Sequence, residues 1–461
     1  MKMTTEEAFV KVLQMHGIEH AFGIIGSAFM PISDLFPKAG ITFWDVAHEG
    51  NGAIICDGYT RSTGKIAMVI AQNGPGITNF VTSIKTAYWN HTPMLLVTPQ
   101  AANRTIGQGG FQEVEQMALF RDMVCYQEEV RDPSRVAEVL NRVITKAKRL
   151  SAPAQLNIPR DFWTQVIDIN ADRIGLTKPV TVGICGDAKL VAKGILAQLS
   201  PSAGDIERDA RTALIHSTRS RWLQTLSSMD HEDDDPGTTW NADAVERDPD
   251  RMSPRQAWRA IQAGLPKDAI ISSDIGNNCA IGNAYPIFDK GRKYLAPGLF
   301  GPCGYGFPAI IGAKIGNPDA PCVGFAGDGA FGISMSEMSS IGRKQYPGIT
   351  MVIFRNFQWG AEKRNSILWY DNNFVGTELD PKLSYAKVAE GCGLKGVVAR
   401  TPAELTEALR KSCQDQKKRI TTFVEVILNQ ELGEPFRRDA MKKPVMVAGI
   451  KREDMRSQVV A

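Results

Sequence analysis

The chain has 461 residues and a formal net charge of +3, with 43% hydrophobic and 22% charged residues. This composition is typical of a globular protein of two or three domains, and the small net charge argues against a surface built for nucleic acid. No apolar run approaches the roughly 18 residues of a membrane span, and eight cysteines without a C-x-x-C pair predict free thiols in a cytoplasmic protein.

Residues 1–168 alternate helical patterns with short apolar runs. The first helix is expected to begin at Thr4 or Thr5 with Glu7 in its first turn, so this acidic start is not a signal peptide. Five apolar runs follow: HAFGII, ITFWDVA, KIAMVIA, PMLLVTP and PAQLNIP. Strands that alternate with helices predict a doubly wound parallel sheet, so 1–168 is expected to be one α/β domain.

Residues 255–461 repeat this organisation and predict a second α/β domain. Their apolar runs are AIISSD, CVGFAGD, ITMVIFRN, GVVAR and TTFVEVIL. Between the two domains, 169–254 holds one strand-helix pattern and then a charged helical stretch that ends in DHEDDDPG. One strand cannot make a sheet and a charge run is usually solvated, so 169–254 is interpreted as a truncated central domain and linker.

Glu49 stands at the turn between the apolar run 41–47 and a helical pattern of small residues. Backbones approach closely there and water is scarce, which favours a carboxylic acid that keeps its proton. Glu49 and its neighbour His48 are therefore candidate catalytic residues. In isolation, an N-cap or first-turn residue favoured by the helix dipole is the stronger interpretation of Glu49.

A glycine-rich turn follows the apolar run of residues 322–326. Gly327, Gly329 and Gly332 match the G-x-G-x-x-G fingerprint of dinucleotide-binding proteins. Asp328 lies inside this loop, and two like charges 4 Å apart cost roughly 4 kcal/mol at an effective dielectric near 20. Asp328 would repel a pyrophosphate unless a cation lay between them, which disfavours an NADP-dependent dehydrogenase.

A divalent cation explains this arrangement. Mg²⁺ takes oxygen ligands in octahedral geometry and commonly shares them between protein and phosphate. Asp328 offers a carboxylate, Asn356 at the end of the next strand offers an amide oxygen, and Gln358 offers a backbone carbonyl. The amides of Gly329 and Ala330 would then face phosphate oxygens. The sequence therefore predicts a magnesium-diphosphate site at the ends of two neighbouring strands.

These segments resemble the thiamine diphosphate-dependent acetohydroxyacid synthase/pyruvate oxidase superfamily. GDGAFG…RNFQWG is similar to its diphosphate-Mg²⁺ motif, with Arg355 in place of the first of two asparagines, and AHEGNGAIICDGYTRSTGK is similar to the segment around its glutamate. RTIGQGGFQEVEQMALFRDMV, SSDIGNNCAIGNAYP and ELGEPFRRDAMKKPV further resemble the sulfoacetaldehyde acetyltransferase family, which converts sulfoacetaldehyde and phosphate into acetyl phosphate and sulfite.

The resemblance implies a pyrimidine-binding domain, 1–168, and a diphosphate-binding domain, 255–461, with thiamine diphosphate and Mg²⁺ as cofactors. It also implies a homodimer or homotetramer whose sites form where the first domain of one subunit meets the last domain of another. Glu49 would exchange a proton with N1′ of the cofactor. The cofactor-binding residues implied are Glu49, Gly74, Gly76, Asn79, Asp274, Gly276, Asn277, Cys303, Tyr305, Gly327, Asp328, Gly329, Ala330, Asn356, Trp359 and Gly360.

A site for a sulfonate and a phosphate needs cations and fixed hydrogen-bond donors. The candidates are Arg104, Gln112, Lys363, Arg364 and the cluster Arg437, Arg438, Lys442 and Lys443. Cys303 stands where relatives often carry a bulky apolar residue that supports the cofactor, and a simple core thiol is the other interpretation. Two other functions stay open: an acetohydroxyacid synthase-like carboligase acting on 2-oxo acids, and an inactive remnant left by an internal deletion.

Overall fold

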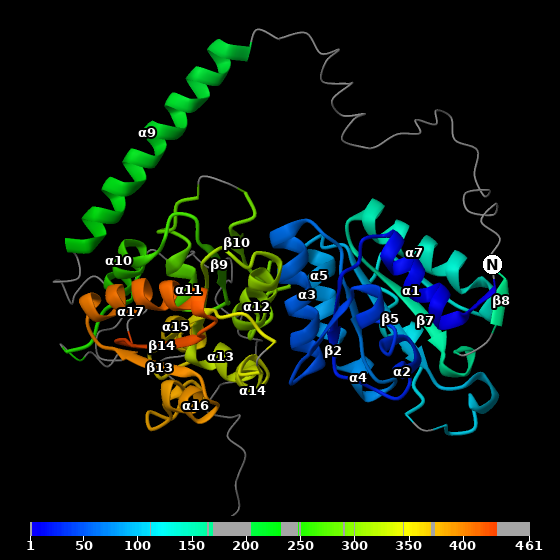
Figure 1. The fold of residues 1–461 in the computed structure, drawn as a ribbon. Helices are drawn as coiled ribbons and strands as arrows, with labels where there is room; N and C mark the ends of the chain where they lie inside the picture. Colours follow the sequence, from blue (N-terminus) through cyan, green and yellow to red (C-terminus); the bar gives the residue numbers. More distant parts are fainter. Residues whose placement is uncertain are drawn as a thin grey trace, which may run out of the picture.

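The computed structural model describes residues 2–110, 112–163, 166–168, 204–231, 248, 250–288, 291–298, 300–343, 345–369 and 374–430. These residues form two α/β domains, each built on a six-stranded sheet (Figure 1). The strand-helix pattern expected within 169–203 and the basic cluster within 437–443 lie outside the described residues. Among the described helices, none combines the length and the apolar content needed to cross a bilayer.

The N-terminal sheet is parallel throughout, with the strand order β3-β2-β4-β5-β7-β6. Its strands are β2 (His20–Gly23), β3 (Thr42–Asp45), β4 (Met68–Ile70), β5 (Met94–Gln100), β6 (Tyr126–Glu129) and β7 (Pro153–Pro159). The five predicted strands are present and the parallel doubly wound sheet is confirmed. Strand β6 was missed because its sequence, YQEE, is polar and only partly buried at this edge of the sheet.

Helices cover both faces of this sheet. One face packs against α1 (Thr5–Met15) and α7 (Val136–Leu150), and the other against α3 (Glu49–Thr63) and α5 (Val81–Trp89). Thr4 and Glu7 form the capping box that starts α1, as predicted. The short elements are α2 (Met30–Ser33), α4 (Pro75–Thr78), α6 (Gln116–Leu119) and an antiparallel pair of β1 (Lys2–Thr4) with β8 (Val166–Asp168).

The C-terminal sheet is also parallel, with the order β10-β9-β11-β12-β14-β13. Its strands are β9 (Ile270–Ser273), β10 (Tyr294–Leu295), β11 (Cys322–Gly327), β12 (Thr350–Arg355), β13 (Lys395–Ala399) and β14 (Thr422–Ile427). All five predicted strands are present. The additional strand, β10, has two residues and is too short for a sequence pattern to indicate.

Helices again cover both faces of the C-terminal sheet. One face carries α10 (Pro254–Gly264), α11 (Asn277–Gly282) and α17 (Pro402–Asp415), and the other carries α12 (Gly306–Gly316), α14 (Met338–Ile341) and α16 (Tyr385–Gly391). Two more helices, α13 (Asp328–Ser334) and α15 (Gly360–Trp369), follow β11 and β12 in the chain. The carboxyl ends of β9, β11 and β12 therefore lead directly into α11, α13 and α15.

The helix α9 (Gly204–His231) is largely exposed and extends away from the two domains (Figure 1). Leu226 is buried with the core under α10, and the Trp222 indole N–H donates a 3.2 Å hydrogen bond to the carbonyl of Ala284. The charged helical stretch predicted to be solvated is therefore mostly so, with Trp222 and Leu226 joining it to the C-terminal domain.

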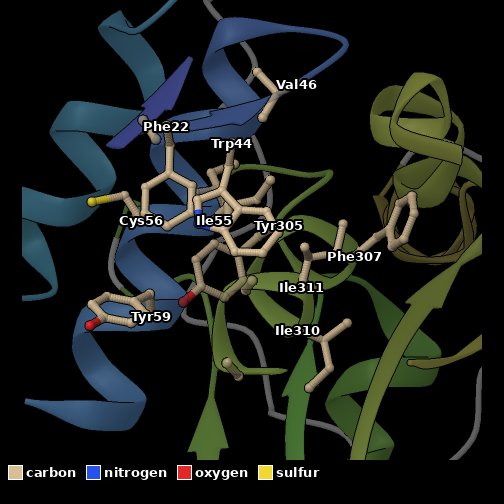
Figure 2. Close-up of a cluster of buried hydrophobic side chains, with 14 of the residues drawn as sticks. Phe22, Trp44, Val46, Ile55, Cys56, Tyr59, Tyr305, Phe307, Ile310 and Ile311 are labelled. Atoms are coloured by element: carbon tan, nitrogen blue, oxygen red, sulfur yellow. The ribbon is translucent and has the colours of Figure 1, made fainter. Parts of the chain in front are cut away.

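The two domains share one hydrophobic core, in which α3 packs against α12 (Figure 2). Ile55 and Tyr59 from α3 meet Phe307 and Ile311 from α12 in this core. The helices cross so closely that a Cβ atom built on Gly312 would overlap the carbonyl oxygen of Ile55. The absence of a side chain at residue 312 therefore sets the distance between the domains.

Gly312→Ala should lower the free energy of unfolding by about 1–3 kcal/mol, because overpacking forces the two helices apart. Urea unfolding measures this change. The matched control is Gly391→Ala at the end of α16, where a Cβ atom meets nothing within 4 Å. If both variants unfolded at the same urea concentration, the close crossing of α3 and α12 would be wrong.

Candidate active site

A cavity of about 850 Å³ opens at the carboxyl ends of β9, β11 and β12. Strands β9 and β11 are neighbours from which the chain continues to opposite sides of the sheet, and parallel α/β sheets bind ligands at such a point. Twelve predicted residues line the cavity: Asp274, Gly276, Asn277, Cys303, Gly327, Asp328, Gly329, Ala330, Asn356, Gln358, Trp359 and Gly360. Trp222 from α9 lines it as well.

Asp328 is the first residue of α13, and its side chain is 1% exposed. Its carboxylate accepts hydrogen bonds from the backbone N–H groups of Gly329 (3.0 Å) and Phe357 (2.7 Å) and from the Arg355 guanidinium (3.2 Å). Burial raises the pKa of Asp328 to about 6, and the positive charge of Arg355 is the largest influence against this rise. The Asp328 carboxylate is therefore fixed in position at the cavity wall by three hydrogen bonds.

The turn after β12 brings Asn356 and Gln358 to the same wall. Between them Phe357 has a φ of +60°, which costs a bulky residue backbone strain and is typical of functional sites. This conformation lets the Phe357 N–H point at Asp328. The Gln358 amide N–H donates to the carbonyl of Gln430 at 3.1 Å, while its buried Oε1 atom has no hydrogen-bond partner among the described residues.

The cavity fits a hard cation and a diphosphate. Besides Gln358, the buried Oδ1 atom of Asn278 is an acceptor without a hydrogen-bond partner in the described part of the chain, and both residues line the cavity. The described residues hold no group of three or more His, Cys, Asp or Glu side chains that could bind a metal by themselves. One carboxylate with amide and carbonyl oxygens suits Mg²⁺, which shares its ligands with phosphate.

Asp274 shapes the loop that carries Cys303. Its carboxylate accepts backbone N–H groups of Ile275 (2.9 Å), Gly304 (3.1 Å) and Gly306 (2.7 Å). Burial raises the pKa of Asp274 to about 6 against these hydrogen bonds, and burial raises the pKa of the Cys303 thiol to about 11. Cys303 is thus a neutral, weakly polar side chain in the cavity wall.

Glu49 begins α3 and is 9% exposed. The side-chain amide of Asn79 donates a 2.9 Å hydrogen bond to its carboxylate, and a Cβ atom built on Gly76 would lie 3.1 Å from the other carboxylate oxygen. His48 is exposed and caps α3, with Nδ1 accepting the N–H of Gly50 at 3.1 Å. The predicted neighbours of Glu49 are therefore assembled around it.

Glu337, which no sequence motif indicated, connects the start of α3 to the C-terminal domain. It follows α13, is fully buried, and accepts hydrogen bonds of 3.0 Å from the Ala47 N–H, the His48 N–H and the Asn51 side chain. Burial raises the pKa of Glu337. Its one sequence signal is that it is the only charged residue in GISMSEMSSIG.

Three predicted residues are buried and do not line the cavity. Tyr305 is fully buried at the domain interface, where its hydroxyl donates to Asp57 at 2.7 Å and accepts from Arg61 at 2.6 Å. Lys363 is buried on α15, where its ammonium group pairs with Glu378 (2.7 Å) and donates to Gln430 (2.9 Å). Arg364 is buried as well and does not line the cavity.

The sequence predicts that Lys363 and Arg364 face the cleft, whereas in the structure both are buried and neither lines this cavity. A basic pair after a metal-binding turn resembles a substrate contact in sequence, but α15 turns both side chains inward. Lys363 contacts Glu378 and Gln430, which lie on other segments of the chain that only the fold brings near it.

The remaining two candidates lie on the loop after β5. Arg104 is exposed on the short turn Asn103–Thr105 and does not line the cavity. Gln112 lies beside the turn at Gly74: its side chain accepts from Gln72 at 2.8 Å and its carbonyl accepts from Asn73 at 3.0 Å. Gln112 is thus close to the segment that borders Glu49, whereas Arg104 lies further out along the same loop.

Comparison with known proteins assigns the two domains. Residues 3–119 match the thiamine pyrophosphate enzyme, N-terminal TPP binding domain, and residues 274–426 match the corresponding C-terminal TPP binding domain. The chain belongs to the thiamine pyrophosphate enzyme family. The two matches contain Glu49 and the lining residues from Asp274 to Gly360, so both parts of the candidate site belong to cofactor-binding domains.

Full-length relatives are found among the sulfoacetaldehyde acetyltransferases. A probable sulfoacetaldehyde acetyltransferase of Rhizobium meliloti (strain 1021) is 61% identical, covering 99% of this chain and all of the relative. A sulfoacetaldehyde acetyltransferase of Roseovarius nubinhibens (strain ATCC BAA-591 / DSM 15170 / ISM) is 58% identical, over 100% of this chain and 98% of the relative. The first alignment has 588 positions, more than the 461 residues here, which is consistent with a shortened middle segment.

A solved structure supports the fold. The thiamine diphosphate-dependent 4-hydroxybenzoylformate decarboxylase of Rhodococcus jostii RHA1 superposes with a TM-score of 0.73 at 18% identity, covering 94% of this chain and all of the other. At this identity the likeness concerns the fold alone.

Asp274→Asn should flatten the pH dependence of stability. A carboxyl group whose pKa rises on folding, here from 3.8 to about 6, stabilises the folded state while protonated, and this stability is lost as pH rises from about 4 to about 6. We expect the difference in unfolding free energy between wild type and Asp274→Asn to change by ~3 kcal/mol over that window. Urea unfolding at a series of pH values measures it; a constant difference would contradict the buried carboxyl.

Proposed function

We propose that this thiamine pyrophosphate enzyme converts sulfoacetaldehyde and phosphate into acetyl phosphate and sulfite, with thiamine diphosphate and Mg²⁺ as cofactors. The observation that carries the proposal is the contact through Glu337, which joins the start of α3, with Glu49, to the segment after α13, with Asp328. The substrate is inferred from the names of the full-length relatives.

The metal half of the site has a defined proposed task. Asp328 and Asn356 would hold Mg²⁺ together with the backbone carbonyl of Gln358, and the Gly329 and Ala330 amides would face the diphosphate. Gly276, Asn277, Trp359 and Gly360 would form the remaining wall of the cofactor site, which is supported by their place around the cavity.

The other half would handle a proton. Thiamine diphosphate, when bound, supplies a nucleophilic carbon for the attack on a carbonyl group. Glu49 would hold and exchange a proton at the pyrimidine N1′ atom, since it is nearly excluded from water and is oriented by Asn79. Gly74 and Gly76 would border the pyrimidine ring, and Cys303 would support the bent cofactor from the cavity wall.

Fewer residues are proposed as substrate contacts. Gln112 beside the Gly74 turn and Arg104 on the same loop would bind the anionic groups of the substrates, and exposed His48 would relay protons beside Glu49. Buried Lys363 would instead fix the cavity wall through Glu378 and Gln430.

Sulfite release with and without phosphate tests the function. We expect the purified chain with thiamine diphosphate and Mg²⁺ to release sulfite from sulfoacetaldehyde and to form equal amounts of acetyl phosphate only when phosphate is present. Glu49→Gln should lower this rate by about 10²–10⁴ while cofactor binding, measured by calorimetry, persists. Pyruvate consumption without sulfite release would favour the carboligase, and a folded chain that binds no cofactor would favour the inactive remnant.

We further propose a cytoplasmic homodimer or homotetramer whose sites form between subunits. The face of α3 that meets α12 is apolar and extensive, and the same contact would form if two copies exchanged their N-terminal domains. The cytoplasmic location is supported by the seven described cysteines, all of them free thiols.

Mixing two inactive variants tests the subunit arrangement. Co-expressed Glu49→Gln and Asp328→Ala chains should regain up to about a quarter of wild-type activity if sites form between subunits, because each mixed dimer then holds one intact site. Each variant alone is the control. If the mixture stays as inactive as its parts, Glu49 and Asp328 of the same chain make the site, and the proposed arrangement between subunits is wrong.

A further inference from the structure

A permanent positive charge lies behind the cavity wall, where a ligand in the cavity would not touch it. Arg355 ends β12, is 1% exposed, and does not line the cavity. It approaches the Asp328 carboxylate at 3.2 Å, whereas Asp328 itself lines the cavity.

Both terminal nitrogens of the Arg355 guanidinium donate hydrogen bonds, whereas its buried Nε atom makes only an ion-pair contact among the described residues. Besides Asp328, the guanidinium donates to the carbonyls of Asp380 (3.0 Å) and Leu383 (2.8 Å), and its Nε atom lies 3.3 Å from the carboxylate of Glu425. Its charge also lies over the rings of Phe357 (4.5 Å) and Tyr385 (5.4 Å). A cation held in this way cannot leave when another charge arrives.

The cluster is a chain of three buried charges. Glu425 is held in turn by the Ser384 hydroxyl (2.7 Å) and the Ala386 N–H (3.0 Å), so one positive charge stands between two carboxylates. Charges act strongly on each other in such a low-dielectric interior. Arg355 must therefore change how the cavity side of Asp328 attracts ions of either sign.

We propose that Arg355 is a positioning residue whose charge compensates Asp328 before any ligand binds, so that the site disfavours a free divalent cation and favours the diphosphate. This inference rests on the proposed function, because it requires that Asp328 faces a cation and a diphosphate. The ion would consequently bind well only together with the diphosphate. The diphosphate supplies negative charge for the ion, whereas the charge of Asp328 is already compensated by Arg355.

Arg355→Asn separates this role from a structural one, because charge compensation predicts shifts of opposite sign for two ligands. Without thiamine diphosphate, Mn²⁺ should bind Arg355→Asn at least about tenfold more tightly than wild type, measured by electron paramagnetic resonance. Without metal, in the presence of chelator, thiamine diphosphate should bind several-fold more weakly, measured by calorimetry. A residue that only supports the fold would weaken both.

Two matched variants complete the test. Arg355→Lys keeps the charge but loses hydrogen bonds, so both affinities should stay near wild type although the melting temperature falls. Glu425→Gln removes the opposite charge from the same cluster, so it should weaken Mn²⁺ binding and strengthen cofactor binding. It also provides the measurement if Arg355→Asn does not fold.

The inference is overturned if Arg355→Asn weakens both ligands, or if Arg355→Lys and Arg355→Asn shift Mn²⁺ binding alike, or if Glu425→Gln leaves both affinities unchanged. Mn²⁺ that fails to bind wild type even with thiamine diphosphate present would overturn the proposed metal site itself. That result concerns Asp328 and Asn356, and it is distinguishable because wild type and variants would then behave identically.

Discussion

The close crossing of α3 and α12 is the constraint on which the site depends. Glu49 lies at the amino end of α3, and the cavity lies in the other domain, so their separation is fixed only while these two helices stay in contact. The crossing is apolar and therefore rigid through packing, since interiors are as dense as organic crystals. Glu337 also fixes the start of α3 relative to the C-terminal domain, because three N–H donors there converge on its carboxylate.

Buried carboxylates recur in this protein as clamps for backbone rather than as free charges. Asp274 holds the loop before α12, Asp328 holds the turn after β12, and Glu337 holds the start of α3. Burial destabilises the charged form of each carboxylate and raises its pKa, whereas the N–H groups that donate hydrogen bonds to it stabilise the charged form. The chemistry of the site is thus surrounded by loops whose shape is set by ionisable groups.

The sequence was sufficient for the sheets and for placing Asp328 and Asn356 at the wall of one cavity, because both depend on local patterns. Ten apolar runs predicted ten strands, and Asp328 and Asn356 could be paired because parallel strands end at a common edge. The edge strands β6 and β10 were missed since one is polar and the other has two residues. Glu337 and the inward direction of Lys363 depend on contacts between distant segments, which no local pattern contains.

The indole ring of Trp222 connects the shortened middle segment of the chain with the cavity. Trp222 belongs to α9, outside both matched cofactor domains, yet its indole is part of the wall around Asn277 and Asn278. The described wall of this cavity is consequently composed of two regions of the polypeptide, α9 and the C-terminal domain, instead of the C-terminal domain alone. The part that α9 plays in this wall depends on the hydrogen bond from Trp222 to the carbonyl of Ala284.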